Sequence, residues 1–288
     1  SFLDYVLPGG ELFEYLRCAQ ISGLVGNTLF THAGLPRSGE KWMPGWVPGQ
    51  PQQEGLTLAE WMEALERLRV GALQQYEEAH AAGTPPVPEA WSSVGGYDHP
   101  QPGSALAQYG MRDMPDGSRQ PSVIYNGFLS EDDYQAITPD KATLDWLRSG
   151  GVRRVVCGHL PHGDSPMVLR AAEDLDLVTA DIAYATDTSW HGDPPPLAKP
   201  KGEGPVHVGE VLIGPGPDDC LLHGFLVSGH AFEARLSDAV VGSVTEDGWR
   251  VKGRVEEGLL LSRNENWNFE RRLMSEEKFN TVKVEPRT

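Results

Sequence analysis

The alternation of a helix-like segment with short β-branched runs in residues 138–185 is the feature that most constrains the fold of this chain. The segment TPDKATLDWLRSGG predicts a helix with Thr138 as its N-cap and Gly150 at its end. Three runs that follow it predict strands: VRRVVCGH (152–159), PMVLRA (166–171) and LDLVTADIAYA (175–185). Helices alternating with such strands are typical of an α/β sheet, so the predicted fold class is α/β with mixed α+β character.

The first 130 residues add two further helices and two further strands to this prediction. Residues 9–17 carry apolar side chains at helical spacing, and residues 57–83 begin with the capping-box pair Thr57 and Glu60. Residues 26–36 predict a buried strand that ends in a turn, and PSVIYNGFL (121–129) predicts another strand. The Pro- and Gly-rich residues 84–120 predict a long, ordered loop.

The last third of the chain has a different, strand-rich character. A Pro/Gly/Lys segment, HGDPPPLAKPKGEGP, predicts a linker over residues 191–205 between a domain over residues 1–190 and a β-rich extension over residues 206–288. Within the extension, HGFLVSG (223–229) and KGRVEEG (252–258) each predict a hairpin.

Charge and cysteine usage limit the classes of partner and compartment. The net charge of −17, from 24 Lys and Arg against 41 Asp and Glu, would repel a phosphate backbone, so we expect no nucleic-acid partner. The absence of an apolar stretch near 18 residues predicts no membrane segment. Three scattered cysteines favour a reducing compartment, either the cytoplasm or another such space, and leave an organelle stroma or a cilium open. The opening SFLDYVLPGGELFEYLR lacks signal-peptide character and reads as a start within a domain.

Two histidines follow predicted strands in the manner of metal ligands. His32 stands in TLFTHAG and His159 in VVCGHLPHG, each beside a glycine that keeps the local backbone slim. A strand end fixes an imidazole rigidly while the following turn leaves room for an ion. Taken singly, a histidine at a strand end more often serves a structural role, and the pairing of the two is what favours a metal site.

These two stretches, LFTHAGL (29–35) and VVCGHLPHG (155–163), resemble histidine motifs of the calcineurin-like metallophosphoesterases. Within that superfamily the chain is most similar to the Shewanella-like protein phosphatases. PGGEL, GGYDHPQPGS, PSVIY, GHLPHGDSP and TADIAYA have counterparts there, and the similarity extends unevenly over about residues 5–260.

The resemblance implies the later half of a four-layer αββα sandwich around a binuclear centre of Mn, Fe or Zn, followed by the β-rich extension. His32 and His159 would be metal ligands, and a metal-bridging hydroxide would attack a phosphoprotein or a small phosphoester. Further candidate residues have less defined roles near the metals or the substrate. His162 would face phosphate or cap its turn, Asp164 would bond amides of its own loop, and Asp181 would orient an imidazole or satisfy a turn. In some relatives an Arg binds phosphate at the position that Asn126 occupies in this chain. Asn126 has neither the positive charge nor the paired N–H donors of a guanidinium.

The sequence lacks the family's D-x-H, G-D-x-x-D-R-G and G-N-H-[ED] motifs, which supply the other ligands. Two histidines cannot hold a binuclear site, so we expect this chain to be inactive alone. Three interpretations remain. The chain is the C-terminal portion of a metal-dependent phosphatase, a phosphatase-derived scaffold within a larger assembly, or an unrelated hydrolase or binding protein.

Overall fold

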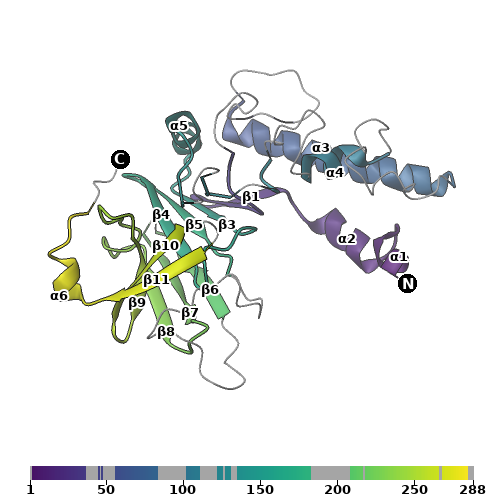
Figure 1. Ribbon diagram of the computed structural model, residues 1–288. Coiled ribbons are helices and arrows are strands. Elements are labelled where there is room, and N and C mark those ends of the chain that lie inside the picture. Colours follow the sequence, from purple (N-terminus) through teal and green to yellow (C-terminus); the bar gives the residue numbers. More distant parts are fainter. Residues whose placement is uncertain are drawn as a thin grey trace. The chain divides into compact units, whose positions relative to one another are not determined.

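The computed structural model describes residues 2–36, 45, 47, 56–83, 102–110, 122–125, 127–130, 135–182, 208–216, 218–265 and 268–284 (Figure 1). The chain divides into two compact units. The first unit comprises Ser1–Gly23 and Thr31–Asn126, and the second comprises Leu24–Phe30 and Gly127–Thr288.

Helices make up most of the regular structure in the first unit. They are α1 (Phe2–Val6), α2 (Glu11–Cys18), α3 (Leu58–Ala81) and α4 (Ser104–Gly110). The capping box predicted for α3 is present, because the Glu60 amide donates to Thr57 Oγ1 over 3.3 Å and the Thr57 amide donates to Glu60 Oε2 over 2.8 Å. The helical stripe of α3 buries Leu58, Trp61 and Leu65 in the core of this unit. Both helices predicted here are therefore confirmed.

Two predictions for the first unit are wrong. Helix α4 lies inside the predicted loop of residues 84–120; at seven residues it is too short to show a helical period, and the fully buried Tyr109 anchors it. The described part of PSVIYNGFL forms bends and, at Leu129, an isolated bridge to Ala136 rather than a strand. The hydroxyl of Ser122 accepts hydrogen bonds from the amides of Ile124 and Tyr125, which removes donors that a strand would offer to its neighbour.

A five-stranded sheet contains the strands predicted in the middle of the chain. Its order is β1-β2-β3-β5-β4. The strands are β1 (Ser22–Val25), β2 (Thr28–Thr31), β3 (Arg154–Cys157), β4 (Met167–Ala172) and β5 (Leu175–Thr179). Strand β3 is parallel to both β2 and β5, whereas β4 is antiparallel to β5. The mixed α/β class is therefore confirmed.

Helix α5 (Lys141–Ser149) precedes β3, as predicted, but its N-cap is Asp140 rather than Thr138. The carboxylate of Asp140 accepts a hydrogen bond of 3.0 Å from the amide of Thr143, and Thr138 lies two residues too early for this cap. Gly150 is the C-cap, as predicted.

A six-stranded sheet forms the tail and confirms its predicted β character. Its strands follow one another in the order β11-β10-β9-β8-β7-β6. Their bounds are β6 (Val208–Ile213), β7 (Cys220–Phe225), β8 (Ala231–Arg235), β9 (Arg250–Val255), β10 (Gly258–Glu265) and β11 (Asn268–Met274), with the short α6 (Glu276–Phe279) after them. Both predicted hairpins are present, one between β7 and β8 and the other between β9 and β10.

The two sheets bury facing surfaces in one hydrophobic core within the second unit. Alternate residues of the five-stranded sheet, such as Val156 and Val178, enter the same cluster as Leu222, Phe232 and Leu260 of the six-stranded sheet. This shared core is what brings the tail sheet against the loops of the five-stranded sheet. The predicted linker at residues 191–205 lies outside the described residues, so the predicted domain boundaries stay a prediction.

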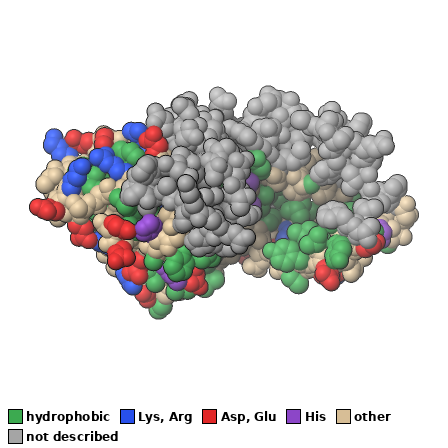
Figure 2. Space-filling view, turned by 60° about the horizontal axis from the view of Figure 1, so that its bottom comes forward, with side chains coloured by type: hydrophobic (Ala, Val, Ile, Leu, Met, Phe, Trp, Pro, Cys, Tyr) green, Lys and Arg blue, Asp and Glu red, His purple; other side chains and the backbone are tan. Residues whose placement is uncertain are grey.

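On the face shown in Figure 2, Asp and Glu side chains are interspersed with Lys and Arg side chains on the second unit. Among the helices that the structure describes, none has the length and apolarity needed to cross a membrane.

Candidate functional site

The loop of residues 158–166, GHLPHGDSP, leaves the carboxyl end of β3 and returns into β4. His159 has a φ of 76°, a left-handed conformation that no other non-glycine residue adopts in the described part of the chain. The crowding of Cβ against the following carbonyl makes this conformation cost about 1–2 kcal/mol for a non-glycine residue. Gly163 is the second residue of this loop with a left-handed backbone, at a φ of 96°. The loop therefore holds His159 in a strained conformation, a feature that often accompanies function.

The two predicted metal ligands differ in their surroundings. His32 is exposed directly after β2, in the first unit, whereas His159 is half-buried in the second unit and its Nε2 atom is shielded from solvent. Their convergence on one site stays a prediction.

Asp164 anchors the loop to the tail sheet through buried contacts. Its Oδ2 atom accepts a hydrogen bond of 2.6 Å from Arg271 on β11 and one of 3.0 Å from the Val227 amide in the β7–β8 turn. Both side chains of the Asp164–Arg271 ion pair are at most 4% exposed. The amide that Asp164 engages belongs to the tail, which corrects the prediction that it bonds amides of its own loop.

Lys252 is a second buried anchor. Its side chain, 1% exposed, donates to the carbonyl oxygens of His162 and Ser165 over 2.6 and 2.7 Å. Lys252 lies where the β9–β10 register shifts opposite Leu260 and Leu261, and such a bulge re-aims a side chain. Burial lowers the pKa of Lys252 to about 7, although Asp164 opposes this effect.

His162 is buried and points toward the tail sheet. Its ring, 3% exposed, meets the ring of Phe269 edge-on with centroids 6.3 Å apart. Burial lowers the pKa of His162 well below its ordinary value, and the positive charges of Lys252 and Arg250 lower it further, so the imidazole is neutral at pH 7. Its Nε2 atom is buried and has no hydrogen-bond partner in the structure. The two roles expected for His162, facing phosphate or capping its turn, stay predictions.

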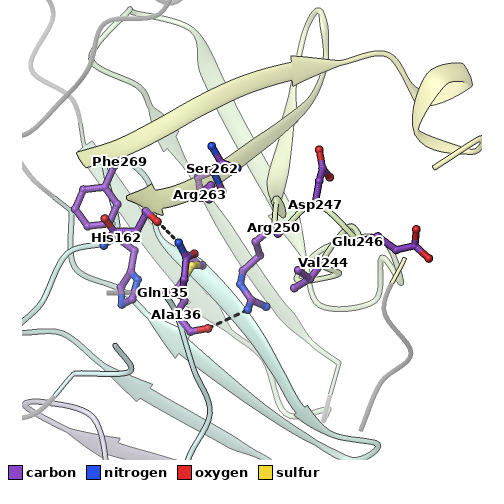
Figure 3. A pocket seen from close by; sticks show the side chains of 13 residues that line it. Gln135, Ala136, His162, Val244, Glu246, Asp247, Arg250, Ser262, Arg263 and Phe269 are labelled. Carbon is purple, nitrogen blue, oxygen red and sulfur yellow. Dashed lines mark hydrogen bonds between the residues drawn. The ribbon is translucent and has the colours of Figure 1, made fainter. Parts of the chain in front are cut away.

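A pocket of about 520 Å³ lies in front of His162, within the second unit (Figure 3). Figure 3 shows His162 and Phe269 at one end and Glu246 and Asp247 at the other. The polar and aromatic residues that matter most to its chemistry are Gln135, His162, Arg250, Ser262, Asn264 and Phe269.

Asn264 is the most unusual lining residue of this pocket. Its side chain is 5% exposed, and both its Oδ1 and Nδ2 atoms are buried without a hydrogen-bond partner in the structure. Its backbone carbonyl, in contrast, accepts a hydrogen bond from the Gln135 side chain. The amide group is thus buried beside the pocket with both of its hydrogen-bonding functions unused.

Asn264, Arg250 and Lys252 were not predicted as site residues from the sequence. One signal was present, since alternate residues on one face of β10 change from Leu260 to Ser262 and Asn264. The position of Arg250 opposite Ser262 depends on strand register, and the orientation of Lys252 depends on the bulge, so neither could be read from local pattern.

The remaining predicted site residues provide little further support for a metal centre. Asp181 is half-buried and its charge adds to the effect of burial in raising the pKa of Cys157 to about 12. Asn126 lies outside the described residues. No group of three or more His, Cys, Asp or Glu side chains that could hold a metal ion occurs in the parts of the chain that the structure describes.

Comparisons with known families, with curated proteins and with solved structures find no match for this chain.

Proposed function

We propose that this chain takes part in metal-dependent phosphoester hydrolysis, as the later half of a four-layer αββα phosphatase fold with His32 and His159 as metal ligands. The observation that carries the proposal is the parallel pairing of β2 with β3, in which Leu29 lies opposite Val155 and Phe30 opposite Val156. The carboxyl ends of neighbouring parallel strands meet at one edge of a sheet, where ligand sites of α/β proteins form. The two histidine-bearing stretches follow these two strand ends in the sequence.

Two imidazoles do not fit a binuclear centre by themselves. Such a site needs at least three or four ligands for each ion, and the described residues provide no third ligand in a group. We therefore propose that polypeptide outside this sequence completes the site, and that this chain alone has little activity. The substrate class is a phosphoprotein or a small phosphoester.

A phosphatase-derived scaffold is the second candidate, and the anchoring of the loop that carries His159 favours it. Lys252 and the Asp164–Arg271 pair hold this loop through contacts made entirely by protein groups. A loop held in this way keeps its shape without a metal ion, so a chain that had lost catalysis could still keep this fold.

Metal analysis and hydrolysis of p-nitrophenyl phosphate by the longest natural form of the protein distinguish the two candidates. The His32→Ala and His159→Ala variants test the ligands, and His223→Ala is the matched control, because this partly exposed histidine on β7 pairs with Glu210 at 2.8 Å. If the proposal holds, both test variants lose bound metal and turnover while the control keeps them. Turnover unaffected by both test variants would exclude the ligand assignment, and a natural form without metal or turnover would favour the scaffold.

A further inference from the structure

We propose that strand β6, at one edge of the six-stranded sheet, binds an extended segment of a partner protein as an added strand, and that this segment carries a lysine or arginine between two apolar side chains. Among the described strands, β6 is the last in the order of this sheet, beside β7 (Figure 1). An edge strand presents N–H and C=O groups to which another strand can pair. The inference does not depend on metal binding or on phosphatase activity.

The two edges of this sheet differ in how they are protected against such pairing. The other edge strand, β11, carries Glu270, Arg271 and Arg272 in succession, and charged side chains are a common protection of sheet edges. Strand β6 has the sequence VGEVLI, with Glu210 as its single charged residue and without a proline. Its ladder with β7 extends from Val208 to Ile213 without a register shift, so no bulge turns this edge away. Strand β6 is therefore the less protected edge.

Exposed apolar side chains accompany this edge on the outer face of the sheet. Val208 and Leu212 on β6 are 52% and 46% exposed, and Phe225, which is paired with Val208 on β7, is 51% exposed. The alternating residues Val211 and Leu222 belong to the opposite face and join the hydrophobic core. An added strand extends the same outer face, so apolar side chains beside Val208 and Leu212 remove this surface from water.

An acidic row crosses this face between the two apolar positions of β6. Glu210 lies opposite His223, and His223 lies opposite Glu233, so the three residues form one row across β6, β7 and β8. The Glu210 carboxylate lies 2.8 Å from His223 Nε2, and its side chain stays 57% exposed. A lysine or arginine opposite Glu210 in the added strand forms a cross-strand pair of opposite charge. Because Val208 and Leu212 lie two residues to either side of Glu210, the pattern apolar–x–basic–x–apolar fits in either strand direction.

The charges favour a basic partner over a second copy of this chain. Directly opposed residues of an antiparallel pair share one face, so two copies of β6 related by a twofold axis place Glu210 opposite Glu210 or opposite an apolar residue. The first arrangement brings like charges together, and the second leaves the carboxylate without a partner of opposite charge. The net charge of −17 on each copy adds to this repulsion, whereas a basic segment is attracted.

Fluorescence anisotropy with the labelled peptide Thr-Val-Thr-Lys-Thr-Leu-Thr, titrated with the full chain, tests the inference. A second peptide has glutamate in place of lysine. The lysine peptide is expected to bind saturably, and the glutamate peptide at least about tenfold more weakly, because its carboxylate meets that of Glu210. Glu210→Lys is expected to reverse this preference, whereas Glu277→Lys, at an exposed residue of α6, keeps it. Equal binding of the two peptides, or no saturation by the lysine peptide at millimolar concentration, would overturn the proposal.

The Leu212→Ser variant links binding to β6, and Val25→Ser is its control, because Val25 is 70% exposed on β1 at the edge of the other sheet. Leu212→Ser is expected to weaken binding of the lysine peptide at least about fivefold, because it removes an apolar contact with the added strand. The control is expected to bind as the unmodified protein does. Equal weakening in the two variants would place binding elsewhere.

Backbone amide hydrogen exchange in the unmodified protein provides a readout that does not depend on the folding of a variant. Saturating lysine peptide is expected to slow exchange within Val208–Ile213, because an added strand pairs with this edge. Unchanged exchange there would overturn the assignment to β6. Sedimentation of the chain alone is expected to show no dimer, and a dimer that Leu212→Ser dissociates would assign this edge to a second copy instead.

Discussion

The two histidine-bearing turns of this protein are held in place by different means. The turn after β2 is held by neutral groups, because the Thr31 hydroxyl donates to the Ala33 carbonyl over 2.7 Å and the Ala33 amide donates to the Val123 carbonyl over 2.7 Å. The loop after β3 is held by buried charged groups, Lys252 and the Asp164–Arg271 pair. His32 ends exposed and unstrained, whereas His159 ends half-buried with a left-handed backbone.

The tail sheet therefore helps to shape the loop after β3. The contacts that fix the loop join residues 90 and 107 positions apart in the sequence. The β-rich extension therefore does more than cover the five-stranded sheet. It sets the conformation of the loop that carries both His159 and His162.

The largest expected effect is the loss of stability on breaking the Asp164–Arg271 pair. In Asp164→Ala the guanidinium of Arg271 stays buried without its carboxylate, and the Val227 amide loses its acceptor. Urea denaturation is expected to show a loss of about 3–5 kcal/mol in the free energy of unfolding.

The control for this prediction is Asp174→Ala, which breaks an exposed ion pair with Arg148 of similar length, 2.6 Å. Solvent screens this pair, so a change of at most about 1 kcal/mol is expected. Equal losses in the two variants would show that the buried pair does not anchor the loop.

Lys252 gives the next largest effect, which is a dependence of stability on pH. The unfolded lysine keeps its proton up to its ordinary pKa of 10.5, whereas the folded lysine releases it near pH 7. Since the unfolded state binds more protons between these values, stability is expected to rise with pH above 7, by about 1 kcal/mol per pH unit.

The measurement is best made between pH 7 and 9, because two thiols oppose the trend above that range. Burial raises the pKa of Cys157 to about 12 and that of Cys220 to about 11, so only the unfolded thiols ionise near pH 9 and stability then falls. Lys252→Met is expected to flatten the rise between pH 7 and 9. An unchanged slope in this variant would contradict the assignment to Lys252.

The comparison of the two turns also shows how far the sequence predicted this molecule. Local signals were sufficient for α3, whose capping box and stripe are both present, and for the strands that precede His32 and His159. Local signals failed where a single side chain accepts a hydrogen bond from a nearby backbone amide. Ser122 does so in the predicted strand, and Asp140 does so at the start of α5.

The candidate site could be predicted only in part, for a physical reason. The loop sequence itself drew attention to His162 and Asp164, both of which are buried and engaged with the tail. Their partners Lys252, Arg271 and Phe269 are brought to them by strand register and by a bulge, and these depend on pairing across the whole sheet. No pattern within a short window contains that information.

The strain at His159 gives a smaller predicted effect. His159→Gly and His159→Ala both remove the imidazole, but the alanine Cβ keeps the steric cost of a φ of 76°. We expect the glycine variant to be more stable than the alanine variant by about 1 kcal/mol in urea denaturation. The reverse order would indicate that the loop does not hold the left-handed conformation in solution.

The smallest expected effect is that of His32→Ala on stability. His32 is exposed, and the contacts that shape its turn are made by Thr31 and by the backbone, so the free energy of unfolding should change by no more than about 0.5 kcal/mol. A loss above about 1 kcal/mol would show that the ring packs against another part of the protein. If the free energy of unfolding is unchanged, His32→Ala tests the proposed metal site without disturbing the fold. Any loss of metal or turnover in His32→Ala would then reflect lost ligation, whereas the same loss in His159→Ala could arise equally from a displaced loop.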